Sequence, residues 1–122
     1  MDIRNFENVV NLQLTRCTEM LKVKGSEYAP GYDVLQNFKD AANMNGTSEE
    51  QALWGYVTKQ LVSLKDMVKT SPTNHSMTHW EEKLSDVINY MLLLKAIVVE
   101  AHWNEEASHQ PALIENKENV PA

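Results

Sequence analysis

Cysteine is nearly absent from this chain of 122 residues, which contains only Cys17. An intramolecular disulfide needs two cysteines, so none can form, and we expect a protein of a reducing compartment, the cytoplasm. Cys17 falls within an apolar helical pattern and no partner residues cluster near it in the sequence. A small core side chain is therefore favoured over a reactive thiol.

Long apolar runs and a surplus of basic residues are also missing. The most apolar segment, from Val87 to Val99, is interrupted by Asn89 and Lys95 and is too short to span a bilayer. The N-terminal segment MDIRNFENVV has no apolar signal core. The net charge of -6 disfavours duplex nucleic acid as a partner, because such binding depends on basic patches. A single nucleotide stays open, since one or two lysines or a metal ion offset its charge.

The alternation of apolar and polar residues that marks a β-strand is absent, and helical spacing takes its place. In the first part of the chain apolar residues recur at steps of three and four, which predicts a long helix that ends at Gly25. A short helix is predicted from about Val34 to Met44, closed by Asn45 and Gly46. The apolar stripe of the first helix is Ile3, Phe6, Val10, Leu14, Cys17 and Leu21.

Two more long helices are predicted after the short one, each opened by a capping-box pattern. The first pattern is Thr47 with Glu50, and the second is Thr78 with Glu81. Between the two helices, Pro72 in the segment TSPTNHS breaks the chain. The expected apolar stripes are Trp54, Val57, Leu61, Leu64 and Val68 on the former helix and Trp80, Leu84, Val87, Met91, Leu94 and Val98 on the latter.

The expected architecture is an all-α helical bundle of three long helices plus one short helix, formed by residues 1–106. From Met91 to Val99 the last helix is apolar on nearly every side, and such a helix needs cover on every side. Three long helices leave part of it uncovered, so we expect a homo-oligomer, a dimer or larger. Residues 107–122 are polar and lack periodicity, which favours a flexible tail over a linear motif read by a partner.

Two lines of polar residues run along the long helices, opposite the predicted apolar stripes. They are Glu82, Asp86 and Asn89 on the last helix and Lys59, Ser63 and Asp66 on the helix before it. Such a line is most simply a solvated face. If the last helix is covered on both sides, the lines instead face an interior cleft. There Asp66, Glu82 and Asp86 are suitable ligands for Mg²⁺, and Lys59 is suited to a phosphate.

The segment from Lys24 to Phe38, KGSEYAPGYDVLQNF, is richer in chemistry than a connection between two helices requires. It combines aromatic rings, carboxylates and an amide, the mixture that small-molecule sites use. Tyr28 and Tyr32 are suited to stacking on a base, and Asn37 to reading its edge. The alternative is that the rings close the end of the bundle and the glycines make turns.

A family resemblance rests on three segments: KGSEYAPGYDVLQNFKDAA, GYVTKQLVSLKDMV and EEKLSDVINYMLLLKAI. Together they resemble the phage nucleotide-modification-associated domain of the all-α NTP pyrophosphatase superfamily, which includes MazG and the dimeric dUTPases. The resemblance covers about residues 10–100. It implies an oligomeric bundle with a nucleotide in a cleft, Mg²⁺ held by an E-x-x-E helix and an E-x-x-D helix, and Asp33 and Asn37 as polar contacts at the rim.

The two metal-binding motifs are only partly present. Glu82 and Asp86 fall near the second motif, although Lys83 occupies the position three residues before Asp86. In place of the glutamates of the first motif, the preceding helix has Lys59 and Asp66. A pair of Mg²⁺ ions needs more carboxylates than these helices supply. Such a site binds a nucleotide and hydrolyses it poorly or not at all.

Two functions follow from the resemblance. The first is Mg²⁺-dependent hydrolysis of an NTP to NMP and pyrophosphate, with Glu82, Asp86 and Lys59 as catalytic residues. The alternative is a catalytically inactive phage sponge that sequesters a cyclic or linear nucleotide signal of host anti-phage defence. A helical oligomer that acts through its tail is a third hypothesis, which no motif supports. The expected ligand contacts are Lys24, Tyr28, Tyr32, Asp33, Asn37, Ser63 and Asn89.

Overall fold

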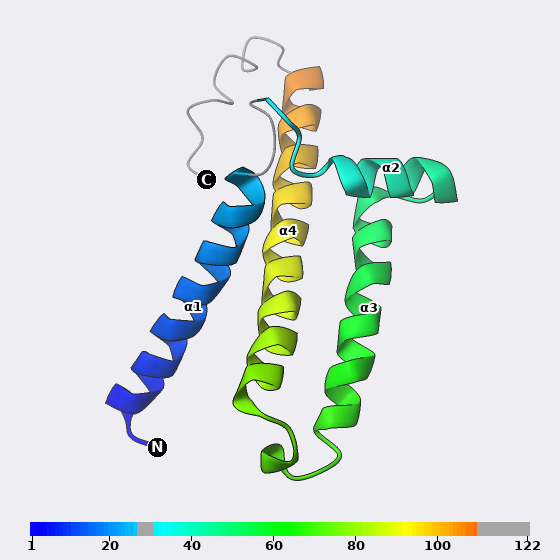
Figure 1. Cartoon of the computed structure of the whole chain (residues 1–122). Helices are drawn as coiled ribbons and strands as arrows, with labels where there is room; N and C mark the ends of the chain where they lie inside the picture. Colours follow the sequence, from blue (N-terminus) through cyan, green and yellow to red (C-terminus); the bar gives the residue numbers. More distant parts are fainter. Residues whose placement is uncertain (27–30, 110–122) are drawn as a thin grey trace.

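The computed structural model describes residues 1–26 and 31–109. This part consists of α1 (Ile3–Ser26), α2 (Gln36–Asn45), α3 (Glu49–Met67), the 3₁₀ turn η1 (Pro72–Asn74) and α4 (Met77–His109). It contains no strand, which confirms the all-α prediction. α3 and α4 form an antiparallel pair, α1 lies on the other side of α4, and α2 runs across the end of α3 (Figure 1). The tail predicted for residues 107–122 falls partly within α4, and residues 110–122 lie outside the described residues.

The junction between α2 and α3 follows local turn chemistry. Gly46 ends α2 in the left-handed region, at φ 63° and ψ 36°, where glycine carries no steric penalty. Ser48 then caps α3: its Oγ accepts from the backbone N–H of Gln51 at 3.2 Å, and the Gln51 side chain accepts from the Ser48 N–H at 3.0 Å. The predicted box, Thr47 with Glu50, is wrong by one residue. The sequence TSEEQ contains two overlapping capping patterns, Thr47 with Glu50 and Ser48 with Gln51. The sequence pattern alone does not indicate which of the two forms.

The start of α4 is likewise shifted from its prediction. Ser76, not Thr78, caps the helix, because its Oγ accepts from the backbone N–H of His79 at 3.1 Å. The indole N–H of Trp80 donates to the carbonyl oxygen of Pro72 at 2.8 Å. This bond joins η1 to the first turn of α4. Trp80, which the sequence pattern assigned to the apolar stripe, thus also makes a polar contact through its indole N–H.

A small core joins α2, α3 and α4. It is formed by Leu35, Phe38, Leu53, Val57 and Ile97, with Leu53 and Val57 fully buried. The predicted stripe of α3 is therefore only partly correct, since Trp54, Leu61 and Val68 are exposed. The buried face of the helix is rotated toward Leu53, where α2 and α4 converge.

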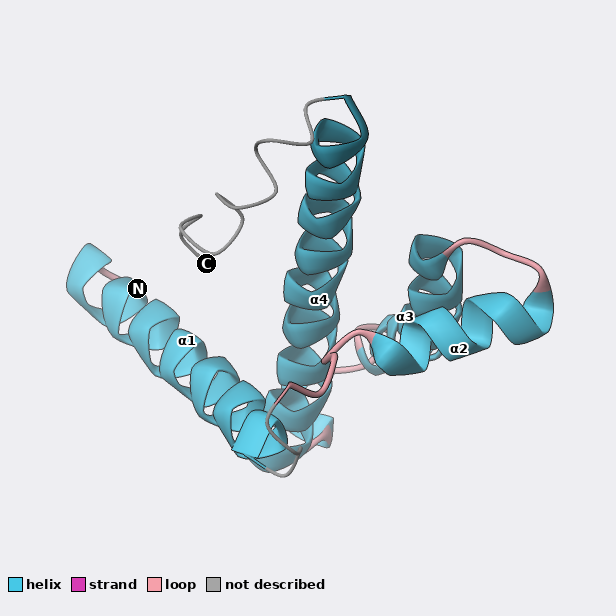
Figure 2. Cartoon of the chain, turned by 90° about the horizontal axis from the view of Figure 1, so that it is seen from above, coloured by secondary structure: helices cyan, strands magenta, loops and turns pink. Residues whose placement is uncertain are grey.

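The first helix is packed along only part of its length. Residues 1–12 are all exposed, and Phe6 and Leu14 of the predicted stripe each expose 54% of their surface. Cys17 is buried against α4, with 1% exposed. Seen from above, the C-terminal end of α1 meets α4, and the N-terminal half of α1 points away from α4 (Figure 2). The apolar stripe of α1 thus continues beyond the contact that covers its C-terminal half.

The last helix buries polar as well as apolar residues. Leu84, Met91 and Val98 of its predicted apolar stripe are exposed, whereas Ser85 and Asn89 are buried. From Met91 onward α4 is apolar on nearly every side, so its sequence does not determine which side is covered. Within residues 1–26 and 31–109, no helix has the length and apolar character needed to cross a membrane.

Candidate functional site

A cavity of about 700 Å³ lies where α1, α2 and α4 meet. Small-molecule sites typically have volumes of about 300–1,000 Å³. Its polar lining comes from Lys24 of α1, Asn37 and Asp40 of α2, and Asp86 and Asn89 of α4. Four of these five groups offer hydrogen-bond acceptors, and Lys24 offers only donors. The cavity therefore suits a ligand with several N–H groups.

Three aromatic rings, Phe38, Tyr56 and Tyr90, belong to the apolar part of the wall. The rest is aliphatic: Met20, Leu21, Val34, Ala41, Met44 and Leu93. The rings of Tyr56 and Tyr90 are parallel within 4°, with centroids 6.4 Å apart, and the ring of Phe38 meets Tyr56 edge to face at 5.9 Å. Burial, and then the charge of Asp86, raise the pKa of Tyr90. The Tyr90 hydroxyl thus stays protonated. The three rings border the cavity, and aromatic rings are able to pack on a planar ligand.

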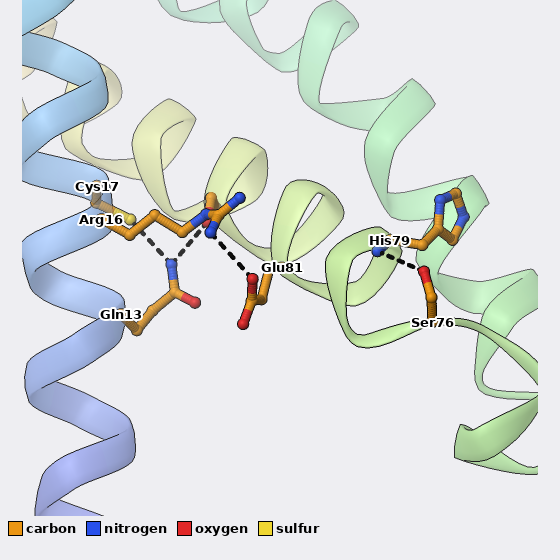
Figure 3. A network of polar contacts seen from close by, with 7 residues as sticks. Gln13, Arg16, Cys17, Ser76, His79 and Glu81 are labelled. Carbon is orange, nitrogen blue, oxygen red and sulfur yellow. Dashed lines mark hydrogen bonds and ion pairs between the residues drawn. The ribbon is translucent and has the colours of Figure 1, made fainter.

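Polar contacts between α1 and α4 fix the register of the two helices beside the cavity (Figure 3). Gln13 Nε2 donates to the Oγ of the fully buried Ser85 at 2.8 Å and lies 3.2 Å from Cys17 Sγ. Arg16 Nη1 pairs with Glu81 Oε2 at 3.0 Å. A shift of α1 along α4 would break these bonds and leave buried polar groups unpaired, which opposes sliding.

The wall that α2 supplies is fastened to α4 through Lys39. Its ammonium donates to the carboxylate of Asp33 and lies 2.8 Å from Glu100 Oε1. The hydrogen bond to Asp33, followed by that to Glu100, raises the pKa of Lys39. Asp33 Oδ1 also accepts from the backbone N–H of Leu35 at 2.9 Å. We call Asp33, Lys39 and Glu100 the Lys39 clamp.

The Lys39 clamp predicts a loss of stability in acid. The hydrogen bond from Lys39 is the largest cause that lowers the pKa of Asp33 below its ordinary value of 3.8. A lowered pKa in the folded state means that Asp33 stabilises the fold above pH 3.8 and loses this contribution as pH falls further. We expect Asp33→Asn to melt below the wild type at about pH 6, and the difference to shrink toward about pH 2.

Thermal unfolding followed by circular dichroism across this pH range measures the difference. Burial raises the pKa of Glu49, a nearby carboxyl. Glu49 therefore favours the folded state more as the pH falls, which is opposite to the effect of Asp33. Both proteins retain Glu49, and its contribution largely cancels in the comparison. A difference in melting temperature that stays constant with pH would contradict the role given to the Asp33 carboxylate.

Four predicted site residues come together at the cavity: Lys24, Asn37, Asp86 and Asn89. Lys24 and Asn37 are exposed, Asp86 is half-buried, and Asn89 is buried. Asp86 and Asn89 of α4 thus line a cleft, which was the alternative interpretation of their polar line. The third residue of that line, Glu82, is exposed, as the favoured interpretation of a solvated face expects.

The predicted residues of α3 and the first turns of α4 lie elsewhere. Lys59 is exposed and Ser63 is half-buried on α3, and neither lines the cavity. Asp66 is exposed, with its Oδ1 3.3 Å from Lys69 Nζ. Glu82 is also exposed and outside the cavity lining. The α3 line and the cavity are therefore separate features of this chain.

The predicted rim residues divide in a different way. Tyr28 lies outside the described residues. Tyr32 is 41% exposed and does not line the cavity, and Asp33 belongs to the Lys39 clamp. Of the predicted rim residues that the structure describes, Tyr32, Asp33 and Asn37, only Asn37 lines the cavity.

The residues proposed to hold Mg²⁺ are not assembled in the described part of the chain. Of Asp66, Glu82 and Asp86, only Asp86 lines the cavity. Among the described residues, no three His, Cys, Asp or Glu side chains come close enough to hold a metal ion. The side chains of a single chain thus do not fit the two-motif magnesium site that the resemblance implies.

Sequence reasoning missed Asp40, Tyr56 and Tyr90. A signal for Asp40 was present, because Asn37, Asp40 and Met44 follow one another at steps of three and four and share one helical face. Tyr90 directly follows Asn89 in a segment already singled out. Tyr56 carried no signal, since the packing of α3 against α2 and α4 brings it to the cavity.

The chain matches no family model, no curated protein and no solved structure. Its fold and its cavity are therefore the basis on which a function is assigned.

Proposed function

We propose that the protein binds a nucleotide, or a small molecule derived from one, in the cavity between α1, α2 and α4, and does not hydrolyse it. The observation that carries the proposal is the composition of one cavity wall. Three aromatic side chains, two amides, two carboxylates and one lysine line about 700 Å³, and they come from four helices. A base needs flat faces and polar groups at its edge, and a phosphate needs a cation such as Lys24.

Binding is favoured over hydrolysis by the positions of the carboxylates. In the NTP pyrophosphatase superfamily that the sequence resembles, attack of water on a triphosphate depends on metal ions held between acidic helices. Asp66 and Glu82, the residues expected to hold such ions here, are exposed and outside the cavity. Lys59 is likewise outside it. We therefore assign no hydrolytic step to this chain. If the chain is a phage protein, as the resemblance implies, this binder is a sponge for a nucleotide signal of host defence.

The test is isothermal calorimetry with a panel of nucleotides, each measured with Mg²⁺ and with EDTA, followed by chromatography of every mixture. We expect binding that persists in EDTA and a ligand that is recovered unchanged. Appearance of pyrophosphate and a monophosphate would contradict the absence of hydrolysis. Failure of every nucleotide to bind would contradict the proposal as a whole.

A matched pair of tyrosine variants locates the site. Tyr56 lines the cavity and Tyr32 does not, yet the two are similarly exposed, at 45% and 41%. Stacking of a base on an aromatic ring is worth about 1–3 kcal/mol. Tyr56→Leu should therefore weaken binding about 10- to 100-fold, whereas Tyr32→Leu should leave the affinity unchanged. Weaker binding by Tyr32→Leu together with unchanged binding by Tyr56→Leu would instead place the ligand beside Tyr32.

The proposal includes self-association of the chain. Two apolar surfaces support it: the stripe at the N-terminal half of α1, and the exposed residues Leu84, Met91 and Val98 of α4. The C-terminal half of the same α1 stripe packs on α4 of its own chain. The uncovered half is also apolar, so an apolar surface such as that of a second α4 would cover it. A second copy of the chain provides one.

A further inference from the structure

Asn89 carries a polar atom that the fold leaves unpaired. The residue is buried, with 8% of its surface exposed, and it lines the cavity on α4. Its Nδ2 faces the sulfur of Met20 at 3.8 Å, a weak acceptor. Its Oδ1 is shielded from solvent and has no hydrogen-bond partner among residues 1–26 and 31–109.

An unpaired buried carbonyl oxygen costs folding free energy, which an apolar side chain at the same place would avoid. Leu93, one turn further along α4, lines the same cavity without such a cost. A ligand that donates a hydrogen bond to Asn89 Oδ1 removes the cost when it binds. In the described part of the chain, the hydrogen-bond partner of the Asn89 amide is Met20, whose sulfur lies at Nδ2, and a flexible thioether repacks easily when a ligand enters.

The surrounding groups point to the same kind of ligand. Asp86 lies one turn before Asn89 on α4, and Asp40 faces the cavity from α2. As carboxylates, both accept hydrogen bonds and repel the oxygens of a ligand. The rings of Tyr90 and Phe38 flank these acceptors. The wall thus combines apolar side chains with the acceptor groups of Asp40, Asp86 and Asn89, while Lys24 and the amide N–H groups are the donors of the same cavity.

We propose that the cavity selects nucleotides whose base carries an exocyclic amino group, and that Asn89 is the specificity-determining residue that accepts a hydrogen bond from it. This inference rests on the nucleotide-binding function proposed above. An amino group supplies two N–H donors to Asn89 and the nearby carboxylates. The oxo group of uracil or hypoxanthine supplies an acceptor in the same place, which meets Asn89 Oδ1 and the carboxylates of Asp40 and Asp86.

The experiment is calorimetry of the full-length chain with two pairs of monophosphates, CMP against UMP and AMP against IMP. Each pair differs in an amino group replaced by an oxo group. We expect the amino member of at least one pair to bind at least about tenfold more tightly, the ratio expected when one hydrogen bond is lost and an acceptor is left facing it. Equal binding within both pairs, or tighter binding of the oxo members, would overturn the inference while leaving nucleotide binding intact. Absence of all binding would overturn both.

The Asn89→Leu variant tests the assigned residue. It should lose the preference for the amino member, and its melting temperature should be equal to or above that of the wild type, because the unpaired carbonyl is gone. Asn8→Leu, the same change at an exposed position of α1, serves as the control and should keep the preference. A preference that survives in Asn89→Leu, or a variant that melts well below the wild type, would show that Asn89 is not the residue that selects the ligand.

Discussion

Replacing Leu53 with alanine is expected to lower the free energy of unfolding by about 2–5 kcal/mol. Leu53 has no exposed surface and belongs to the cluster that joins α2, α3 and α4. Truncation removes buried apolar surface and leaves a void, which the surrounding helices fill only in part. Small domains have a total stability of about 5–15 kcal/mol, so this loss is a large share. Urea denaturation followed by far-ultraviolet circular dichroism measures it.

Leu12→Ala is the matched control for this variant. Leu12 lies on α1 with 72% of its surface exposed, and alanine is the better helix former. Its substitution should change the free energy of unfolding by less than about 0.5 kcal/mol. A comparable loss in both variants would mean that the core is not centred where α2, α3 and α4 meet.

The contrast between Leu53 and Trp54 shows what the sequence predicts about this fold. Spacing of apolar residues correctly indicated helices, and the glycine at position 46 correctly indicated where α2 ends. The same spacing placed Trp54 in the core, yet its neighbour Leu53 is the buried residue. Both belong to apolar rows of α3, and only the direction from which α2 and α4 approach decides between them.

The cavity was predictable in part, for a related reason. The residues of α4 that line it, Asp86 and Asn89, were identified because helical spacing puts them on one face. The residues predicted on α3, such as Lys59, were placed opposite them by assuming that two polar lines face each other. In the structure that side of α4 faces α1 and α2 instead, so Asp40 and Lys24 take the places given to α3. Helix pairing is a tertiary property that periodicity does not encode.

Converting the α1 stripe to acid is expected to separate the proposed oligomer into single chains. The double variant Phe6→Glu with Val10→Glu places two carboxylates on the stripe whose C-terminal half packs on α4. Within a single chain Phe6 and Val10 are 54% and 37% exposed, so the change should spare the fold. In an oligomer that covers the stripe, the same change buries unpaired charges, which costs several kcal/mol or more.

The measurement is the mass in solution, by size-exclusion chromatography with light scattering. We expect the wild type at a multiple of 13.9 kDa and the double variant at 13.9 kDa, with an unchanged helical spectrum. The control, Asn5→Glu with Asn8→Glu, adds the same two charges at exposed positions of α1 on the side away from the stripe. It should keep the mass of the wild type. A wild type that already runs at 13.9 kDa would refute self-association, and dissociation of the control as well would make net charge, not the apolar stripe, the cause.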